Sequence, residues 1–352
     1  MYKGTGISKD QLSDDGEPCI LYGELYTKYK SETIREVISK TNIDNTKLAR
    51  SKANDVIIPC SGETAEDIAT ARCVLNGNIL LGGDLNIIRL HGYDGTFMSY
   101  QLNGKRKYDI AKVAQGVSVV HLYGEHLKGV KTINPCFTEQ KKIASLLTLL
   151  DERIATQNKI IEDLKKLKSA ISKKLLYNDK WTTYKIQDIA EIGRGRVISS
   201  AEIERQKHPL YPVYSSQTSN DGIMGYLDNY MFDGEYITWT TDGANAGTVF
   251  YRKGKFNCTN VCGTLNIHPK FDCYFVSLVL QQATKKYVSS NLANPKLMNN
   301  TMASIKIRMP NIETQKQLSK VFQTLDSCLL VHQQTCKMYL SEKQYLLRQM
   351  FI

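Results

Sequence analysis

The chain has 352 residues, and this length predicts two or three domains. Its formal net charge of +11 at pH 7 favours an anionic partner such as nucleic acid. No run of 18 apolar residues is present, and the N-terminal segment lacks the apolar stretch of a signal peptide. The nine cysteines show no metal-ligand spacing, so we expect a cytoplasmic protein with reduced cysteines, no membrane association and no zinc site.

Residues 1–134 have the pattern of a globular module. Short apolar runs bounded by Gly, Asn and Asp occur at residues 54–58, before Gly62, and at residues 83–87. A short helix is expected to begin near Asp94. Strands of this length predict a mostly antiparallel, twisted sheet with a few small helices.

A long helix is predicted for residues 135–178, because about forty residues after Pro135 contain neither Pro nor Gly. Polar residues interrupt its apolar seam at Gln157 and Lys168, and they form either a solvated edge or a layer that sets the helix register. Its lysine cluster is a solvated face or a phosphate contact (Lys165, Lys166, Lys168, Lys173 and Lys174). The apolar positions, alternately four and three residues apart, form a heptad seam: Ile143, Leu147, Leu150, Ile154, Ile161, Leu164, Ile171 and Leu175.

Residues 179–309 form a second module that repeats the first. Residues 234–238, before Gly243, match the first apolar run, and residues 263–267 match the second. Asp272 takes the place of Asp94 at the start of a short helix. The loops differ while the skeleton is shared, so we expect the skeleton to position loops that differ in binding.

A second long helix is predicted for residues 310–352, beginning at Pro310. Its polar interruptions, His332 and Lys343, come 175 residues after those of the first helix. The duplication predicts two modules with pseudo-twofold symmetry. We expect an α+β fold in which two mixed, mainly β domains are joined by two long antiparallel coiled-coil helices, with seams about 48 Å long. The second seam is Leu318, Phe322, Leu325, Leu329, Cys336, Tyr339, Leu346 and Met350.

Sequence motifs of catalysis are absent. The chain has no GxxxxGK[ST] loop, no third glycine after Gly193 and Gly195, no Asn/Asp-Pro-Pro-aromatic motif and no PD…ExK pattern. We therefore predict no catalytic residue, no bound cofactor and no metal. The histidines lack evident carboxylate or cysteine partners and are expected to be structural: His91, His121, His208, His268 and His332.

This doubled arrangement resembles the specificity subunit of type I restriction-modification systems, and the resemblance covers nearly the whole chain. The opening of the second module, residues 181–195, is similar to the family's start of a target-recognition domain. The helix residues that carry the resemblance are Pro135, Glu139, Gln140, Ile143, Asp151, Ile154, Leu164 and Leu175, then Pro310, Gln315, Leu318, Asp326, Leu329 and Met350.

The resemblance implies a non-catalytic protein in which each module reads one half of a bipartite site in double-stranded DNA. The paired helices would fix an unread spacer, since 48 Å corresponds to about 14 base pairs, and would dock two modification (methyltransferase) subunits. S-adenosylmethionine would lie in those subunits and ATP in the restriction (translocase and nuclease) subunits. One departure is that the first module lacks a counterpart of residues 181–192, so we expect a shortened first domain.

Basic, amide and hydroxyl side chains in the loops are the candidate DNA contacts, although each could equally be an ordinary solvated residue. The segment from Tyr214 to Asn220 follows a predicted strand, and residues 22–27 are its expected counterpart. His121 and Lys296 correspond through the 175-residue shift. The full candidate set is Lys3, Lys9, Tyr22, Glu24, Tyr26, His121, Arg194, Arg196, Ser215, Ser216, Gln217, Thr218, Asn220 and Lys296.

Two other functions stay open at this point. A coiled-coil adaptor with protein-binding modules would show absent or salt-insensitive DNA binding. A nuclease with an unrecognised centre would cleave DNA in a metal-dependent way when purified alone.

Overall fold

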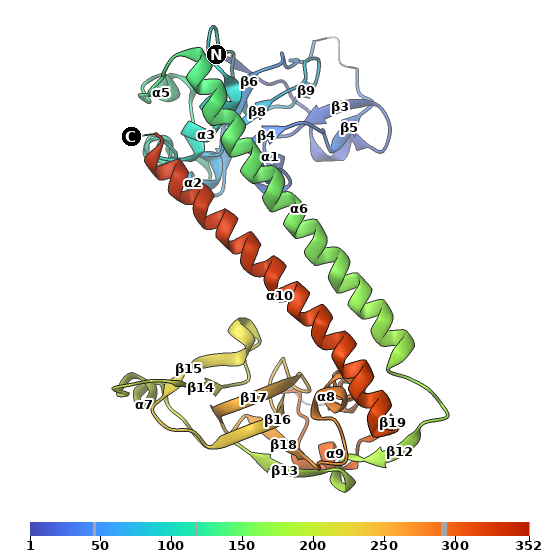
Figure 1. Ribbon diagram of the computed structural model, residues 1–352. Helices are drawn as coiled ribbons and strands as arrows, with labels where there is room; N and C mark the ends of the chain where they lie inside the picture. The colour runs from blue at the N-terminus through green and yellow to red at the C-terminus, as the bar shows by residue number, and fades with distance from the viewer. Residues whose placement is uncertain (45–46, 117, 290–293, 352) are drawn as a thin grey trace. The chain divides into compact units, whose positions relative to one another are not determined.

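The computed structural model describes residues 1–44, 47–116, 118–289 and 294–351 (Figure 1). The chain forms two compact units, each described here by itself. Unit 1 comprises Met1–Ile161 and Val331–Ile352, and unit 2 comprises Glu162–Leu330. Each unit therefore contains one globular part together with segments of both long helices.

The globular part of unit 1 contains a five-stranded sheet with β6 at its centre, and all five residues of β6 are buried. Its strands, in spatial order, are β1 (Tyr2–Lys3), β10 (Leu85–Ile88), β6 (Asp55–Pro59), β8 (Arg72–Val74) and β4 (Thr33–Ile34). Beside it lie a four-stranded sheet, β2 (Leu12–Ser13), β5 (Ser39–Thr41), β3 (Glu17–Ile20) and β9 (Leu80–Leu81), and the pair β7 (Ser61–Gly62) and β11 (Val120–His121). The helices are α1 (Glu24–Thr27), α2 (Ala65–Ile68), α3 (Gly95–Asn103), α4 (Lys107–Lys112) and α5 (Gly124–Lys128).

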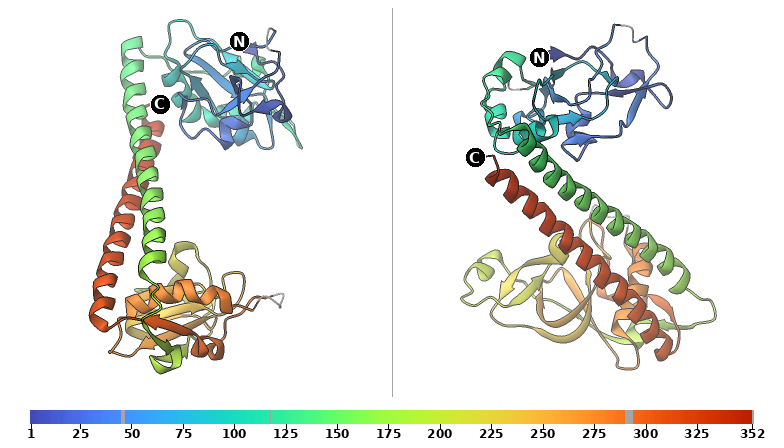
Figure 2. Two further views of the ribbon diagram at one scale, coloured as in Figure 1. Left: turned by 90° about the vertical axis from the view of Figure 1, so that its right-hand side faces the viewer. Right: turned by 45° about the horizontal axis from the view of Figure 1, so that its top comes forward.

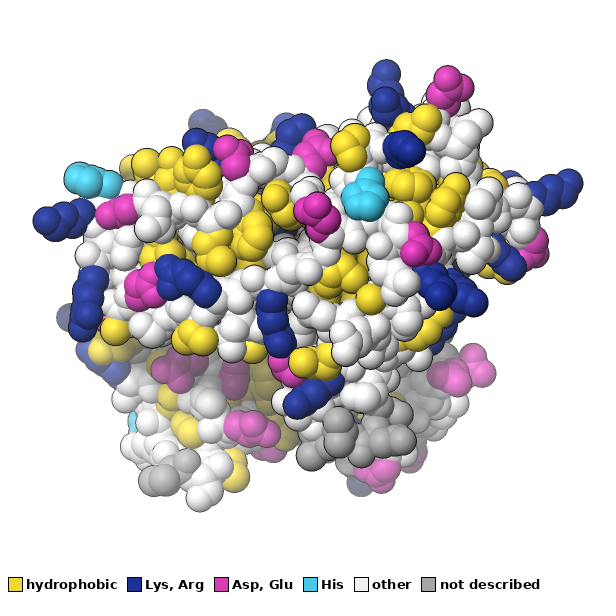
Figure 3. Space-filling view, turned by 90° about the horizontal axis from the view of Figure 1, so that it is seen from below, with side chains coloured by type: hydrophobic (Ala, Val, Ile, Leu, Met, Phe, Trp, Pro, Cys, Tyr) yellow, Lys and Arg dark blue, Asp and Glu magenta, His cyan; other side chains and the backbone are white. Residues whose placement is uncertain are grey.

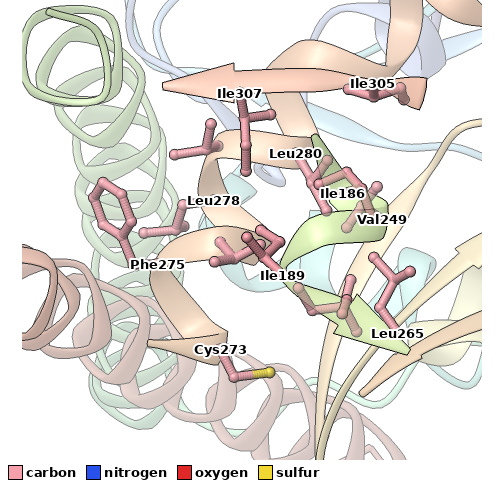
Figure 4. Close-up of a cluster of buried hydrophobic side chains, with 14 of the residues drawn as sticks. Ile186, Ile189, Val249, Leu265, Cys273, Phe275, Leu278, Leu280, Ile305 and Ile307 are labelled. Atoms are coloured by element: carbon pink, nitrogen blue, oxygen red, sulfur yellow. The ribbon is translucent and has the colours of Figure 1, made fainter. Parts of the chain in front are cut away.

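The globular part of unit 2 contains a six-stranded sheet, and helix α8 contacts its strands β16 and β17. Figure 4 shows the core between these elements, where side chains of α8 such as Phe275 and Leu278 lie among Ile186, Ile189 and Ile307. The sheet order is β13 (Ala190–Arg194), β18 (Cys262–Ile267), β16 (Phe232–Thr240), β17 (Val249–Cys258), β14 (Tyr211–Tyr214) and β15 (Ile223–Leu227). The remaining elements are β12 (Thr182–Lys185), which pairs with β19 (Lys306–Met309), and the helices α7 (Ser200–Glu204), α8 (Cys273–Ala283) and α9 (Asn299–Ser304).

The two sheets repeat one another, as the sequence predicts. In both, the first strand of the sheet pairs antiparallel with a second strand, which in turn pairs antiparallel with a central strand: β1-β10-β6 in unit 1 and β13-β18-β16 in unit 2. Helices α3 and α8 begin alike, because Asp94 and Asp272 each accept a hydrogen bond from the backbone three residues later. In unit 2, β12 and β19 form an additional antiparallel pair, and β12 lies within residues 181–192, the segment for which the first module is expected to lack a counterpart.

Helices α6 (Phe137–Leu175) and α10 (Ile312–Gln349) lie antiparallel within each unit. In unit 1, Arg153 contacts Tyr339, and in unit 2, Lys168 contacts Asp326. Figure 2 shows the two ribbons side by side in both views. Seam residues such as Leu147 and Phe322 are fully buried.

One predicted seam position is wrong. Leu175 is exposed, whereas Leu176, its neighbour, is buried in the core of unit 2. The cause is that Leu176, and not Leu175, packs in the hydrophobic core of unit 2 together with Ile171, so the globular part determines which face is buried at the end of α6.

Candidate nucleic-acid interface

In each unit, the residues that follow the central strand of the sheet pair with a segment that is distant in the sequence. In unit 1, the backbone NH of Leu122 donates to Cys60 at 2.7 Å, and in unit 2 that of Leu297 donates to Thr241 at 2.9 Å. His121 consequently lies opposite Ser61, and Lys296 lies opposite Asp242. The predicted correspondence of His121 with Lys296 is therefore confirmed by strand pairing.

A basic side chain from the first strand of each sheet lies beside this segment. Nη2 of Arg194 donates to Oγ1 of Thr241 at 2.9 Å and lies 3.4 Å from a carboxylate oxygen of Asp242. In unit 1, Lys3 pairs with Asn86, which lies opposite Ile58, two residues before Cys60. In unit 2, Arg194 pairs with Gly263, which lies opposite Trp239, two residues before Thr241. Lys3 and Arg194 therefore occupy equivalent places.

The glycine after each of these basic residues is required by a close backbone approach. An added Cβ at Gly4 would lie 1.9 Å from the carbonyl oxygen of Gly82, and one at Gly195 would lie 2.2 Å from that of Cys258. Such contacts exclude any side chain. The glycines that follow Lys3 and Arg194 therefore hold the first strand against the turn that precedes β10 or β18.

Unit 1 brings four predicted residues to one cavity of about 1210 Å³, which Lys9, Tyr22, Glu24 and Tyr26 line together with loop residues on either side. Glu24 has an internal role there. Its carboxylate is 5% exposed and accepts from the backbone of Leu21 at 3.0 Å and from Nζ of Lys28 at 2.6 Å. Glu24 therefore supports the wall of the cavity, while Lys9 is exposed.

Unit 2 presents the predicted segment after β14 as a compact loop. Its end is closed by a hydrogen bond from the backbone of Ser215 to Gly222, 2.8 Å long, and the side-chain amide of Gln217 donates to Ile223. Ser216 is half-buried and accepts through its carbonyl, whereas Thr218 and Asn220 are exposed. The amide nitrogen of Gln217 is therefore engaged inside the loop, and the exposed tip is the part available to a ligand.

Strand pairing corrects the predicted counterpart of this loop by two residues. The carbonyl of Tyr214 accepts from Thr259, and the carbonyl of Ile20 accepts from Gly82 in the same place of unit 1. The counterpart therefore begins at Ile20 rather than at Tyr22.

Arg196 lies outside the Thr241 segment. Its guanidinium forms an ion pair with Glu202 of α7, with Nη1 at 2.9 Å from one carboxylate oxygen, and both side chains are partly exposed. A phosphate or base would therefore compete with Glu202 for this arginine.

In unit 2, the segment from Thr241 to Gly247 contacts several of the predicted DNA-binding residues, although none of its own residues is among them. Asp242 of this segment contacts Arg194 and lies opposite Lys296, and Nδ2 of Asn245 donates to the carbonyl of Ser216 at 3.3 Å. Gly243 and Gly247 have φ of 91° and 80°. These two glycines, four residues apart, are the sequence signal that marks the turn.

Charged residues are dispersed over the face of the molecule in Figure 3, where Lys and Arg lie among acidic and hydrophobic side chains. In the described ranges, no group of three or more His, Cys, Asp or Glu residues could hold a metal ion. Searching the same part of the chain also finds no helix long and apolar enough to cross a membrane.

The polar interruptions of the helix seams form repeated contacts with the globular parts. In unit 1, Asp151 accepts from the hydroxyl of Tyr100 and from Nζ of Lys343, both at 2.6 Å. In unit 2, Asp326 accepts in the same way from Tyr274 and Lys168. The two lysines are 12% and 25% exposed, so the layer interpretation of these breaks is supported over the solvated edge.

Comparison with known proteins places this architecture in a family. The family description "Type I restriction modification DNA specificity domain" matches residues 178–337. A type I specificity subunit of Mycoplasma pneumoniae is 38% identical over 192 residues, which are 52% of this chain and 77% of that protein. The chain belongs to the type I restriction-modification specificity subunits.

Other members of the family are similar over shorter or more divergent alignments. The specificity subunit of the type I restriction enzyme MpnII, from Mycoplasma pneumoniae, is 43% identical over 145 residues, 41% of this chain and 43% of that one. The crystal structure of a type I restriction-modification S subunit from M. genitalium aligns with a TM-score of 0.73 at 18% identity, covering 100% of this chain and 93% of that chain. That likeness shows a shared fold.

Proposed function

We propose that each globular part of this specificity subunit reads one half of a bipartite site in double-stranded DNA. The observation that carries the proposal is the repeated end of the sheet, where Lys3 and Arg194 lie at equivalent places of the first strand, near the segments opposite His121 and Lys296. Different loops are mounted on this common frame: a cavity in unit 1 and an exposed loop tip in unit 2. A shared frame with different loops suits two readers of different sequences.

The helix pair is proposed to set the unread gap between the half-sites. Buried polar contacts in a helix seam favour one register over its alternatives. The Asp151–Lys343 and Asp326–Lys168 contacts provide such positions in both units. The length of the pair would then determine the gap.

The outer faces of the helices are proposed to dock two modification subunits. Large apolar side chains are exposed there, outside the seam, and such side chains in groups are typical of protein contacts. They include Leu146, Leu149 and Met338 in unit 1, and Leu167, Val321 and Leu330 in unit 2.

The chain itself is proposed to be non-catalytic and to act in the cytoplasm as part of a larger complex. In this proposal, S-adenosylmethionine binds to the modification subunits and ATP to the restriction subunits. The chain supplies sequence recognition and spacing, and the chemistry belongs to its partners.

The test is a gel-shift titration of the chain assembled with its modification subunit, at about 50 and 200 mM salt. We expect binding to the methylated sequence to weaken steeply with salt, because several phosphate contacts release counterions. Binding that is absent, or that does not change with salt, would instead support the adaptor function.

A further inference from the structure

A buried arginine lies beneath the predicted recognition segment of each unit. Arg252 on β17 is 6% exposed and Arg72 on β8 is 8% exposed. Burying a guanidinium is costly unless its donors are paired. The partners of these two arginines therefore indicate what each one holds in place.

Arg252 contacts two aromatic rings and donates to the loop after β14. Its guanidinium carbon lies 3.5 Å from the ring centre of Tyr214 and 4.4 Å from that of Phe250. Nη2 donates to the carbonyl of Asp221 at 2.7 Å, and Nε points to Oγ1 of Thr238 at 3.3 Å. Contacts with two aromatic rings restrict the position of the cation.

The loop that Arg252 contacts has an unusual backbone. Asn220, Asp221 and Gly222 follow one another with φ of 50°, 51° and 83°. Two successive non-glycine residues in this region are strained and persist only where their surroundings hold them. The hydrogen bond from Arg252 to the carbonyl of Asp221 is a part-buried contact in the middle of this run.

Arg72 has the same relation to the segment after β3. Its Nε donates to the carbonyl of Leu25 at 3.1 Å, and its Nη2 donates to that of Tyr29 at 3.0 Å. Leu25 belongs to α1, a helix of four residues that is too short to be stable alone. This is the segment whose Tyr22 and Tyr26 line the cavity.

The two arginines do not come from the same position of the repeat. In unit 1, Arg72 pairs with Ile57, which lies three residues before Cys60. The equivalent position in unit 2 is Thr238, three residues before Thr241. Thr238 pairs with Phe250 rather than with Arg252. Arg252 lies two residues further along on the same strand face. The repeated frame alone therefore does not account for both.

We propose that Arg252 and Arg72 are positioning residues for DNA recognition, each fixing the main chain that carries the base-reading side chains of its unit. This inference rests on the proposed function and adds the residues that determine its specificity. Neither arginine is proposed to touch DNA. Loss of either should relax sequence preference in one half-site and leave the other half-site unchanged.

The experiment uses the chain assembled with its modification subunit and DNA duplexes carrying the mapped site or a single changed base pair in either half. Arg252→Met keeps an unbranched apolar side chain in place of the aliphatic part of the arginine and removes its donors, and Arg308→Met on β19 is the control. We expect Arg252→Met to reduce discrimination by about tenfold or more in one half only. Arg252→Lys, which retains one donor and the charge, should restore part of that discrimination.

Unchanged discrimination by Arg252→Met in both halves would overturn the inference. If that variant does not fold, Asn245→Ala removes the other anchor of the loop, the hydrogen bond to Ser216, and should relax the same half-site; no change there would also count against the inference. If the unmodified complex does not discriminate between the duplexes, the proposed function fails and this inference fails with it.

Discussion

Nδ1 of His332 lies 2.7 Å from Oε1 of Gln157, the residue 175 positions earlier. The sequence repeat makes these two positions equivalent, because they are 175 residues apart. The contacts of Asp151 with Lys343 in unit 1 and of Asp326 with Lys168 in unit 2 are related by the same shift. The polar positions of the two seams therefore repeat their contacts from one unit to the other.

Replacing Lys343 should destabilise unit 1 more than the matched change destabilises unit 2. Lys343→Met leaves Glu32 and Asp151, which are 9% and 11% exposed, without their cation. We expect a loss of about 3–5 kcal/mol in the free energy of unfolding of unit 1. Lys168→Met should lose only about 0–1 kcal/mol, because Asp326 is 40% exposed and remains hydrated. Denaturant unfolding, followed separately for the transition of each unit, measures the two losses. Equal losses would contradict this interpretation.

The stability of unit 1 should carry a pH dependence from Glu32. Burial raises the pKa of the Glu32 carboxyl above its ordinary value near 4.5, and Lys343 opposes that shift. A group whose folded-state pKa is raised contributes stability that is present below its unfolded pKa and is lost as pH rises through the folded pKa. Between pH 4.5 and neutrality, Glu32→Gln should therefore show a smaller decline in unfolding free energy than the unmodified chain. An identical decline would exclude Glu32 as its source.

Sequence reasoning could predict the helices and the repeated frame because both depend on periodic patterns. The heptad seams and the shared 175-residue shift are enough to match His121 with Lys296 and to mark Gln157, Lys168, His332 and Lys343 as polar interruptions. Whether those interruptions form a solvated edge or a layer depends on partners in the globular parts, such as Glu32 of unit 1, which the helix period does not specify.

The candidate site was less predictable for a related reason. Glu24 has the chemistry of a base contact, but its orientation depends on how the four-residue helix α1 packs, which a sequence pattern does not specify. Arg72 and Arg252 are single charged residues in strands and carry no spacing signal. Only the fold shows that they are buried against carbonyl groups.

An apolar layer at the centre of the helix pair should raise stability and reduce the uniqueness of the register. The double variant Gln157→Leu with His332→Leu replaces a polar contact by apolar side chains, a change worth about 1–4 kcal/mol in favourable cases. We expect a higher unfolding temperature together with methylation at more than one gap length. A single gap length in the double variant would show that this pair does not set the register.

Lengthening the helices should lengthen the unread gap only if both helices are lengthened together. One heptad inserted between Ile154 and Leu164, and another between Leu329 and Tyr339, moves the Asp151–Lys343 and Asp326–Lys168 contacts apart and keeps each intact. Seven residues add about 10 Å, or about three base pairs. Methylation mapping measures the gap, and an insertion in α6 alone, which shifts one contact out of register, is the control expected to lose methylation.

The most direct test of two independent readers is the exchange of Trp181–Met309 for the equivalent module of another specificity subunit, followed by mapping of the methylated sites in cells that carry the modification subunit. The account predicts that one half-site changes to that of the donor while the other half-site and the gap stay the same. Change in both half-sites, or in neither, would contradict it.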